Sequence, residues 1–229
     1  MFRVMFETAV VAFSVCTLFT ACSNAVDRGG DAPPTDSSAP TDTFIPDDPP
    51  TIVDGYPAGP FGLKKGQIFP NRTLSGYRDG AGAWIDITLK DYFDPDGSRG
   101  INGIYLTVSA PWCAGCVAEA HGFPALYRDK YRPMGARLIT ALVQDGASKP
   151  ATQKTVDAWI SAYGINYDVV ADPDLTTVRM DPTAGGSLAL PYNYVIDPRT
   201  MRITQINAGP IFTGGTIVGL DDLLTRNGG

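Results

Sequence analysis

Residues 103–127 read GIYLTVSAPWCAGCVAEAHGFPALY, and this stretch decides the fold. Its first part, residues 104–108, is apolar and rich in β-branched side chains, which predicts a buried strand. The small and helix-favouring residues that follow Cys113 predict a helix beginning beside the end of that strand. The sequence therefore places a cysteine where a strand turns into a helix.

That position suits a reactive thiol. A helix N-terminus offers unpaired backbone N–H groups and the positive end of the helix dipole, and both favour thiolate over thiol. Cys113 is therefore the predicted nucleophile. Cys116 lies one helical turn further on and returns to the same face, where it can resolve a mixed disulfide.

The beginning of the chain is not typical of a folded domain. Arg3 precedes a short apolar run, residues 9–21, whose length fits the core of a signal peptide better than a membrane span. The run ends in Leu18-Phe19-Thr20-Ala21-Cys22, which resembles the lipobox of bacterial lipoproteins, so residues 1–21 are predicted to be a lipoprotein signal peptide and Cys22 its lipidation site. An ordinary secretory signal cleaved nearby is the alternative.

Residues 22–60 are rich in Pro, Asp, Ser and Thr and contain few apolar residues. Such a segment cannot bury enough surface to offset its ordering entropy, so it is predicted to be a disordered tether. Residues 61–229 remain as one globular domain, which is enough chain for a proper hydrophobic core.

Charge and cysteine content exclude several classes of protein. The net charge is −6 and the basic residues are scattered, which argues against nucleic acid or an anionic membrane surface as the domain's partner. Of four cysteines, Cys16 belongs to the signal and Cys22 to the lipid site. Only one pair remains in the domain, too few for a disulfide scaffold.

Periodicity and turn residues predict the remaining elements. They are strands at 84–89, 136–143 and 167–170, helices at 152–163, 173–180 and 215–224, and a hairpin of 192–197 with 202–207. The acidic loop 94–100 fails the spacing of a calcium loop and is predicted to be a plain turn. The βαβα alternation predicts a parallel core with helices on both faces.

The order of strand, Trp-Cys-x-x-Cys, helix, βα unit and a proline before a hairpin strand resembles a thioredoxin-fold protein. The closest resemblance is to the membrane-tethered, TlpA-like thiol-disulfide oxidoreductases, which overlap with the thiol-specific antioxidant family. It is carried by residues 112–116, by Glu119 and by residues 190–197, LPYNYVID. It implies an α/β thioredoxin fold, a central mixed β-sheet flanked by helices, with an N-terminal strand extension.

The resemblance also implies roles for individual residues. A cis peptide before Pro191 would set the Leu190 backbone beside Cys113, where it can pair with an extended client chain. Trp112 would shield the disulfide edge and offer an apolar docking surface. A partly buried Glu119 would have a raised pKa and could accept or return the Cys116 proton, although it could equally be an exposed helix residue.

Two positions depart from the family pattern. Thioredoxins carry a buried Asp five residues before the motif tryptophan, where this chain has Thr107, so Glu119 would have to replace it. Gly115 stands where a proline is common, and the Ala-Gly dipeptide has no charge to stabilise the thiolate further. We therefore expect the Cys113–Cys116 disulfide to have an intermediate to low reduction potential and not that of a strong oxidant.

Other interpretations of the cysteine pair have less support. Zinc needs four ligands, and the domain offers two thiols, His121 and carboxylates, so no metal site is predicted. Copper-binding relatives usually have three residues between their cysteines and a histidine far away in the sequence. In this chain two residues separate Cys113 from Cys116, and the only histidine, His121, follows five residues later. Peroxidases place a threonine three residues before the reactive cysteine, where this chain has Ala110. An inert disulfide in a redox-inactive binding module remains the non-enzyme alternative.

The sequence thus predicts a cell-envelope thiol-disulfide oxidoreductase that needs no cofactor. Cys113 and Cys116 would exchange disulfides with client proteins, and a separate redox protein would restore the thiols. The lipid anchor would be the only membrane contact, and Ser23 after the lipid cysteine favours the outer membrane, with the domain in the periplasm.

Overall fold

The computed structural model describes residues 49–178, 189–210, 212–213 and 215–228. The chain divides into two compact units, residues 1–43 and 44–229, and every described residue belongs to the second. The predicted signal peptide, Cys22 and residues 23–48 of the predicted tether lie outside the described residues. Those assignments stay predictions.

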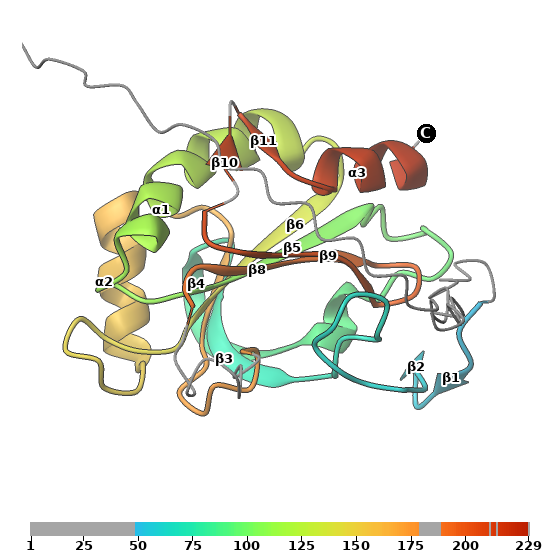
Figure 1. The fold of residues 1–229 in the computed structure, drawn as a ribbon, viewed down its shortest axis with the longest axis horizontal. Helices are drawn as coiled ribbons and strands as arrows, with labels where there is room; N and C mark the ends of the chain where they lie inside the picture. The colour runs from blue at the N-terminus through green and yellow to red at the C-terminus, as the bar shows by residue number, and fades with distance from the viewer. Residues whose placement is uncertain (1–48, 179–188, 211, 214, 229) are drawn as a thin grey trace, which may run out of the picture. The chain divides into compact units, whose positions relative to one another are not determined.

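A seven-stranded mixed sheet forms the centre of the second unit, in the order β4-β3-β7-β6-β5-β8-β9 (Figure 1). The three strands β5, β6 and β7 run parallel, and the other four pair antiparallel with their neighbours. The strands are β3 (Thr73–Arg78), β4 (Ala81–Thr88), β5 (Gly103–Ser109), β6 (Ala136–Leu142), β7 (Asp168–Ala171), β8 (Tyr192–Asp197) and β9 (Arg202–Ala208). The predicted mixed thioredoxin-like sheet with an N-terminal extension is confirmed.

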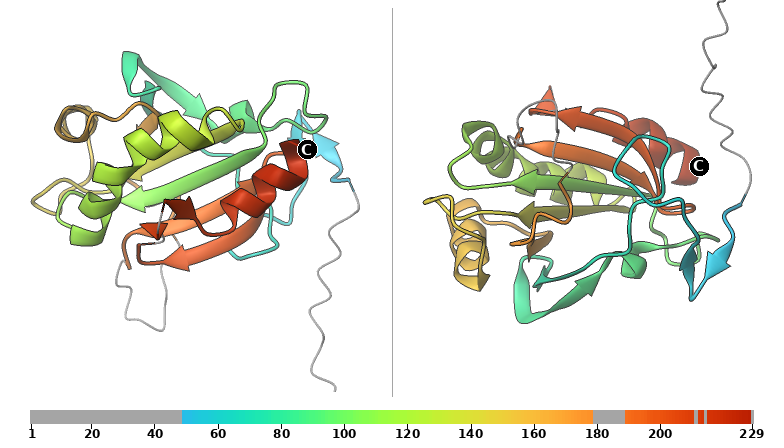
Figure 2. Two further views of the ribbon diagram at one scale, coloured as in Figure 1. Left: turned by 90° about the horizontal axis from the view of Figure 1, so that it is seen from above. Right: turned by 60° about the horizontal axis from the view of Figure 1, so that its bottom comes forward.

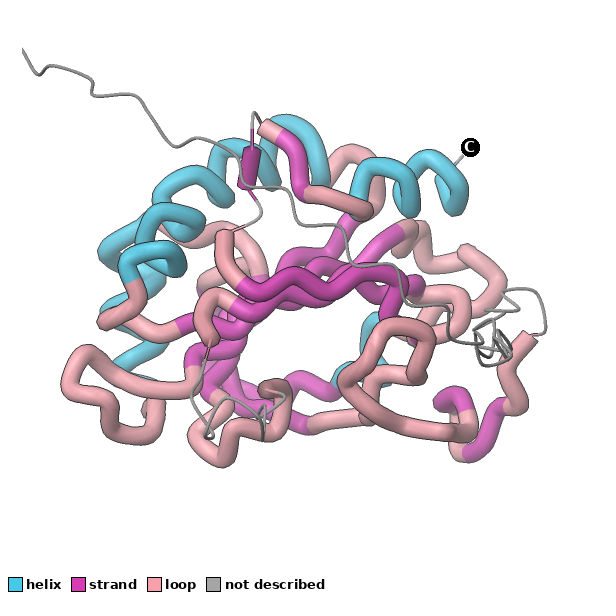
Figure 3. The backbone as a smooth tube through the Cα atoms, in the orientation of Figure 1, coloured by secondary structure: helices cyan, strands magenta, loops and turns pink. Residues whose placement is uncertain are grey.

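Helices cover the sheet unequally. The α-helices are α1 (Ala114–Leu126), continued by the π-helical turn η2 (Tyr127–Tyr131), α2 (Gln153–Tyr163) and α3 (Leu220–Gly228), and the 3-10 helix is η1 (Leu89–Tyr92). The three α-helices of the described residues all contribute to one core cluster, and Figure 3 shows α1 and α3 together above the sheet. Among the described residues no helix has the length and apolar character that a bilayer span requires.

Within the described residues the helices on the two faces differ in kind: α1, α2 and α3 contribute to one core cluster and the 3-10 helix η1 to the other. The strand order advances from β5 to β6 to β7 in one direction, and right-handed crossovers in one direction place their helices on the same face. Within the described residues, η1 is the helix that contributes to the second core cluster, together with strands and loops. One face of the sheet therefore carries α1, which follows the cysteine motif, together with α2 and α3.

Strand β5 positions the site because it is an interior strand, paired with β6 on one side and with β8 on the other. Every residue from Gly103 to Ser109 is buried, so the strand cannot shift without opening both core clusters. Figure 2 (left) shows β5 running to the N-terminus of α1, at the end of the domain opposite to β1 and β2. The cysteine motif thereby follows directly on a completely buried strand.

The folded domain begins before the predicted boundary at residue 61. A small hairpin of β1 (Ile52–Val53) and β2 (Tyr56–Pro57) lies within the segment predicted to be a disordered tether. Tyr56 is 4% exposed, its hydroxyl donates to the Phe69 carbonyl at 2.8 Å, and its ring packs edge-on against Phe93. The prediction of a tether through residue 60 is therefore wrong for this hairpin, because one buried tyrosine anchors it.

Three other elements differ from the sequence-based expectation. Residues 173–178 form turns instead of the start of a helix, and the rest of that predicted helix lies outside the described residues. The last helix begins at Leu220, after the short strands β10 (Phe212–Thr213) and β11 (Thr216–Ile217), and not at Gly215. The strand β3 was not predicted. The hairpin of β8 and β9 and the helix that ends at Gly164 are confirmed.

Candidate active site

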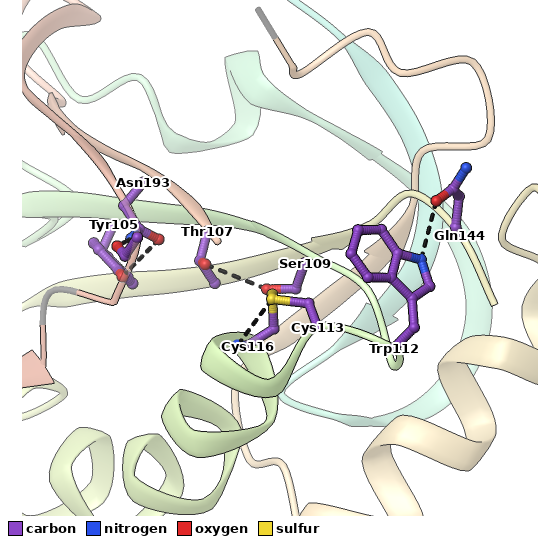
Figure 4. The surroundings of a disulfide bond; sticks show 9 residues. Tyr105, Thr107, Ser109, Trp112, Cys113, Cys116, Gln144 and Asn193 are labelled. Atoms are coloured by element: carbon purple, nitrogen blue, oxygen red, sulfur yellow. Dashed lines mark hydrogen bonds between the residues drawn. A yellow bond between two sulfur atoms is a disulfide. The ribbon is translucent and has the colours of Figure 1, made fainter. Parts of the chain in front are cut away.

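Cys113 and Cys116 form a disulfide at the junction of β5 and α1 (Figure 4). Their Cα atoms are 5.2 Å apart. Cys113 is 6% exposed and Cys116 only 1%. Cys113 is therefore the residue of the pair that a second disulfide can approach, as its assignment as nucleophile requires.

The backbone at Cys113 explains why its sulfur suits nucleophilic chemistry. Cys113 is the N-cap of α1, with an extended backbone, and its Sγ accepts a hydrogen bond from the Cys116 backbone N–H at 3.1 Å. The first turn of α1 contains no acidic side chain that would oppose a negative charge. In the reduced protein the same N–H group and the positive end of the helix dipole favour the Cys113 thiolate.

Trp112 is held beside the motif by a neighbouring loop. Its side chain is 42% exposed, and its Nε1–H donates to Gln144 Oε1 at 3.0 Å (Figure 4). A pocket of about 400 Å³ begins at Pro111 and continues to Trp159 and Tyr163 of α2. An exposed indole with a fixed edge next to an apolar pocket can receive a client chain.

The Leu190–Pro191 peptide bond is cis, as the resemblance implied, and Pro191 lies against the redox motif. A Cβ added to Gly115 would be 3.1 Å from Pro191 Cδ and 2.9 Å from Pro210 Cγ. The Gly209 N–H donates to the Pro191 carbonyl at 2.8 Å. Gly115 is thus enclosed by two prolines from either end of the β8–β9 hairpin, and Leu190, which is half-buried, directly precedes this contact.

A side chain at Gly115 should disturb this contact. In the variant Gly115→Ala the added methyl group must displace Pro210, so we expect the oxidised protein to lose about 1 kcal/mol or more of unfolding free energy, as overpacked sites do. Denaturant unfolding measures this change. Gly146→Ala is the matched control, because its added Cβ would meet no atom within 4 Å. Equal stability of the two variants would contradict the close packing of Pro210 on the motif.

Glu119 lies on α1 one turn beyond Cys116 and is buried, with 2% exposure. It is therefore not the exposed helix residue that the sequence left open. Burial raises the pKa of the Tyr105 and Tyr167 hydroxyls, and the nearby Glu119 carboxylate raises both further. Both tyrosines therefore keep their protons at neutral pH, and the Tyr105 hydroxyl donates to Asn193 Oδ1 at 2.9 Å.

The sheet presents a row of polar side chains beneath α1. Thr107 of β5 is in register with Thr140 of β6 and with Asn193 of β8, and all three are buried. Ser109 continues the row towards the disulfide, 3.3 Å from the Thr107 hydroxyl (Figure 4). The sheet surface around Thr107 therefore carries neutral polar groups, and Glu119 on α1 is a buried carboxylic acid of the same region.

Sequence reasoning missed Asn193 and Gln144. Asn193 lies in a predicted strand, and its one sequence signal is a polar side chain on the same strand face as the buried Val195. Gln144 follows a buried strand and carried no signal, because its partner Trp112 is 32 residues away. Both residues become visible as part of the site only when β5, β6 and β8 are placed side by side.

The structure also places His121 and Tyr194, two side chains near the motif or the hairpin that could have taken part in a site. His121 is exposed on the surface of α1 and meets Tyr163 edge-on, with ring centroids 4.8 Å apart. Tyr194 is fully buried and donates to the Thr177 carbonyl at 2.9 Å, so it belongs to the core. Among the described residues no group of three or more His, Cys, Asp or Glu side chains is placed to hold a metal ion.

Solved structures with the same fold carry thiol-exchange names. A protein assigned as the thiol:disulfide interchange protein DsbE from Chlorobium tepidum aligns with TM-score 0.51 and 20% identity, over 73% of this chain and 100% of that one. A secreted thiol-disulfide isomerase from Corynebacterium glutamicum aligns with TM-score 0.51 and 14% identity, over 69% of this chain and 86% of that one. An uncharacterized conserved protein from Geobacillus kaustophilus aligns with TM-score 0.52 and 16% identity, over 73% and 85%. At these identities the likeness confirms the fold.

The family follows from the sequence itself. No curated protein sequence matches the chain. The sequence model of the AhpC/TSA family, however, matches residues 66–205, which is more than half of the 229 residues and includes the cysteine motif, Glu119 and Pro191. The chain therefore belongs to the AhpC/TSA family.

Proposed function

We propose that this protein is a thiol-disulfide oxidoreductase that exchanges disulfides with client proteins of the cell envelope. The observation that carries the proposal is the Cys113–Cys116 disulfide at the N-terminus of α1, with the Cys113 sulfur as the helix cap. The names of two structures that share the fold agree with it. Family membership alone would also allow peroxide reduction, but Ala110 stands where peroxidases carry a threonine.

The reaction needs no cofactor, because two thiols supply both electrons. The Cys113 thiolate attacks one sulfur of a client disulfide, the client S–S bond breaks, and its first thiolate leaves and takes up a proton. Cys116 then gives its proton to Glu119 and attacks Cys113 Sγ. The mixed disulfide breaks, and the second client thiolate leaves and is protonated. The client gains two electrons and two protons, and the protein is left with its internal disulfide.

Two elements support binding of the client. The backbone of Leu190, before the cis Pro191, is the proposed pairing site for an extended client segment, and the exposed Trp112 supplies an apolar surface beside it. A separate dithiol protein would reduce the Cys113–Cys116 disulfide by the reverse steps. Its identity is set by surface chemistry that the motif does not encode.

The proposed location is the periplasmic face of a bacterial membrane, the outer membrane in particular, through a lipid on Cys22 and a tether to residue 48. Support comes from the placement of the folded part, since β1 and β2 stand at the opposite end of the domain from the N-terminus of α1 (Figure 1). A tether that joins the domain at β1 leaves the cysteines facing away from its own attachment point.

The test is a redox titration against glutathione, read by thiol alkylation. The full chain carries Cys16→Ser and Cys22→Ser, so that only Cys113 and Cys116 report. A reversible two-electron transition in the native protein is the expected result. A pair that is reduced only on unfolding would overturn the proposal and leave a redox-inactive binding module. Faster oxidation by hydrogen peroxide than by a disulfide peptide would favour the peroxidase.

Replacing Glu119 with glutamine should slow the second half of the exchange. The amide keeps the shape of the side chain but cannot take the Cys116 proton, so release of the client from the mixed disulfide should fall about 100-fold, a typical contribution of general base catalysis. Quenched-flow alkylation separates this step from the first attack, which should change little. Equal slowing of both steps would show that Glu119 acts on the overall fold and not as a proton acceptor.

A further inference from the structure

We propose that Asn193 is a positioning residue of this site. Its side chain bonds to Gly209, and Gly209 in turn bonds to Pro191, so that Pro191 and Pro210 stay packed against the cysteine motif. The same side chain links Gly209 to Tyr105, which lies beneath the motif. The inference rests on the proposed disulfide exchange and adds a residue outside the cysteine motif and the cis-proline pair.

Both ends of the Asn193 amide are used, and the residue is completely buried. Its Nδ2 donates to the Gly209 carbonyl at 2.9 Å. Its Oδ1 accepts from the Tyr105 hydroxyl at 2.9 Å (Figure 4). A carbonyl can only accept, so the amide nitrogen must face Gly209 and the amide oxygen must face Tyr105. The orientation of the side chain is therefore fixed by its partners.

Gly209 transmits this constraint to the substrate side of the site. Its carbonyl accepts from Asn193, while its N–H donates to the Pro191 carbonyl at 2.8 Å. Its backbone has φ +91°, a conformation that glycine adopts without strain. The next residue is Pro210, whose Cγ would be 2.9 Å from a Cβ on Gly115. One buried amide thus fixes a segment that touches the cis proline and the redox motif together.

Tyr105 connects the same amide to the interior. Burial and the Glu119 carboxylate keep its hydroxyl protonated, so the hydroxyl remains a donor. Tyr105 is fully buried and packs edge-on against Phe123 of α1 at 5.5 Å between ring centroids. The anchor of the Asn193 oxygen is therefore a rigid aromatic side chain directly below the redox helix.

The two hydrogen bonds of Asn193, to Gly209 and to Tyr105, form a bridge between the Pro191 side of the site and its interior. This bridge matters because disulfide exchange is sensitive to the relative positions of the reacting groups. The client sulfur must approach Cys113 along the S–S axis while the client backbone is held at residue 190, and small displacements of such aligned groups are costly in rate. If Asn193 is lost, Gly209 and Pro210 are free to move away from Gly115 and Pro191. The Cys113–Cys116 chemistry stays intact, but the surface that aligns the client does not.

The test compares Asn193→Leu, Asn193→Asp and Tyr105→Phe with the control Asn227→Leu in the full chain carrying Cys16→Ser and Cys22→Ser. Asn227 also bridges two elements with its amide, to the Asn102 carbonyl and to Asp197, but at the far end of the domain. The readouts are kcat and KM with a disulfide peptide, the equilibrium constant with glutathione, and hydrogen exchange of the Gly209 amide.

For Asn193→Leu we expect at least a tenfold rise in KM and loss of protection at Gly209, while the glutathione equilibrium stays that of the parent protein because the Cys113–Cys116 pair itself is unchanged. Asn193→Asp keeps the volume and the Tyr105 bond, so it reports on the Gly209 bond even if the leucine variant does not fold. Tyr105→Phe should give a smaller KM effect. The control should lose stability only.

Variants of Asn193 that behave like Asn227→Leu in KM and in Gly209 protection would overturn the inference. The two proposals fail separately. If the parent protein shows no reversible redox transition, the oxidoreductase proposal fails while Gly209 protection still tests the bridge. If the parent protein cycles and Asn193 variants match the control, the positioning role fails alone.

Discussion

Cys113→Ser should abolish disulfide exchange and leave only the rate of the buffer reaction. Serine keeps the size and the N-cap hydrogen bond of the cysteine, but its hydroxyl is neither ionised at neutral pH nor able to form the mixed disulfide. No second thiol can take over in the described part of the domain, since Cys116 is only 1% exposed. Turnover of a fluorescent disulfide peptide measures the effect.

Cys116→Ser separates the two halves of the reaction. The Cys113 thiolate should still attack, so the variant should accumulate a mixed disulfide with a client that the intact pair would release. Trapping in envelope extract followed by non-reducing electrophoresis detects these adducts, and Cys113→Ser is the matched negative control. Adducts that form through Cys116 when Cys113 is absent would contradict the assignment of nucleophile and resolving thiol.

The centre of the site could be predicted because its signals are local. A β-branched apolar run, a cysteine at the first helical turn and a second cysteine three residues later lie within one stretch of chain, and each has a physical meaning without a neighbour. The burial of Glu119 could not be predicted in the same way. Its environment is made by Tyr105 and Tyr167, on strand β5 and just before strand β7, which sequence alone does not place together.

The unpredicted strand β3 shows the same limit in the sheet. Gly76 interrupts its pattern of apolar residues, and glycine normally weakens a strand. In the structure a Cβ at Gly76 would lie 2.1 Å from the Val169 carbonyl of β7, so the glycine is what permits the two strands to pair. The strand that requires a glycine at position 76 is therefore about 90 residues away in sequence. Tyr56 is a similar case, because a single aromatic residue in a proline-rich segment gives no periodicity.

A second large effect is expected at Asp94, which anchors the loop after η1. The residue is completely buried. Its carboxylate accepts from the Arg99 and Ile101 backbone N–H groups at 3.2 and 3.0 Å and forms an ion pair with Arg199 at 3.1 Å. Arg199 in turn donates to the Asp94 and Ile101 carbonyls. The acidic loop is therefore a turn closed by an arginine from the β8–β9 connection.

Asp94→Ala should lower the unfolding free energy by about 3–5 kcal/mol, the usual cost of removing one partner of a buried ion pair. The loss has two sources: the partly buried Arg99 N–H and the buried Ile101 N–H lose their acceptor, and the Arg199 charge, with 21% side-chain exposure, loses its counterion. For a domain of this size each kcal/mol corresponds to about 2–4 °C in the midpoint of thermal unfolding. Calorimetry of the oxidised protein measures this shift.

The control is Asp96→Ala, two residues along the same loop. Asp96 is exposed and accepts one hydrogen bond from the Ser98 N–H, so its removal should shift the midpoint far less. Adding Arg199→Leu to Asp94→Ala should cost less than the sum of the single changes, because the second substitution removes the charge that the first left unpaired. Additive losses, or equal losses for Asp94 and Asp96, would show that the ion pair does not hold the loop. The glutathione equilibrium of folded Asp94→Ala should stay unchanged, since the loop lies at the opposite end of β5 from the cysteines.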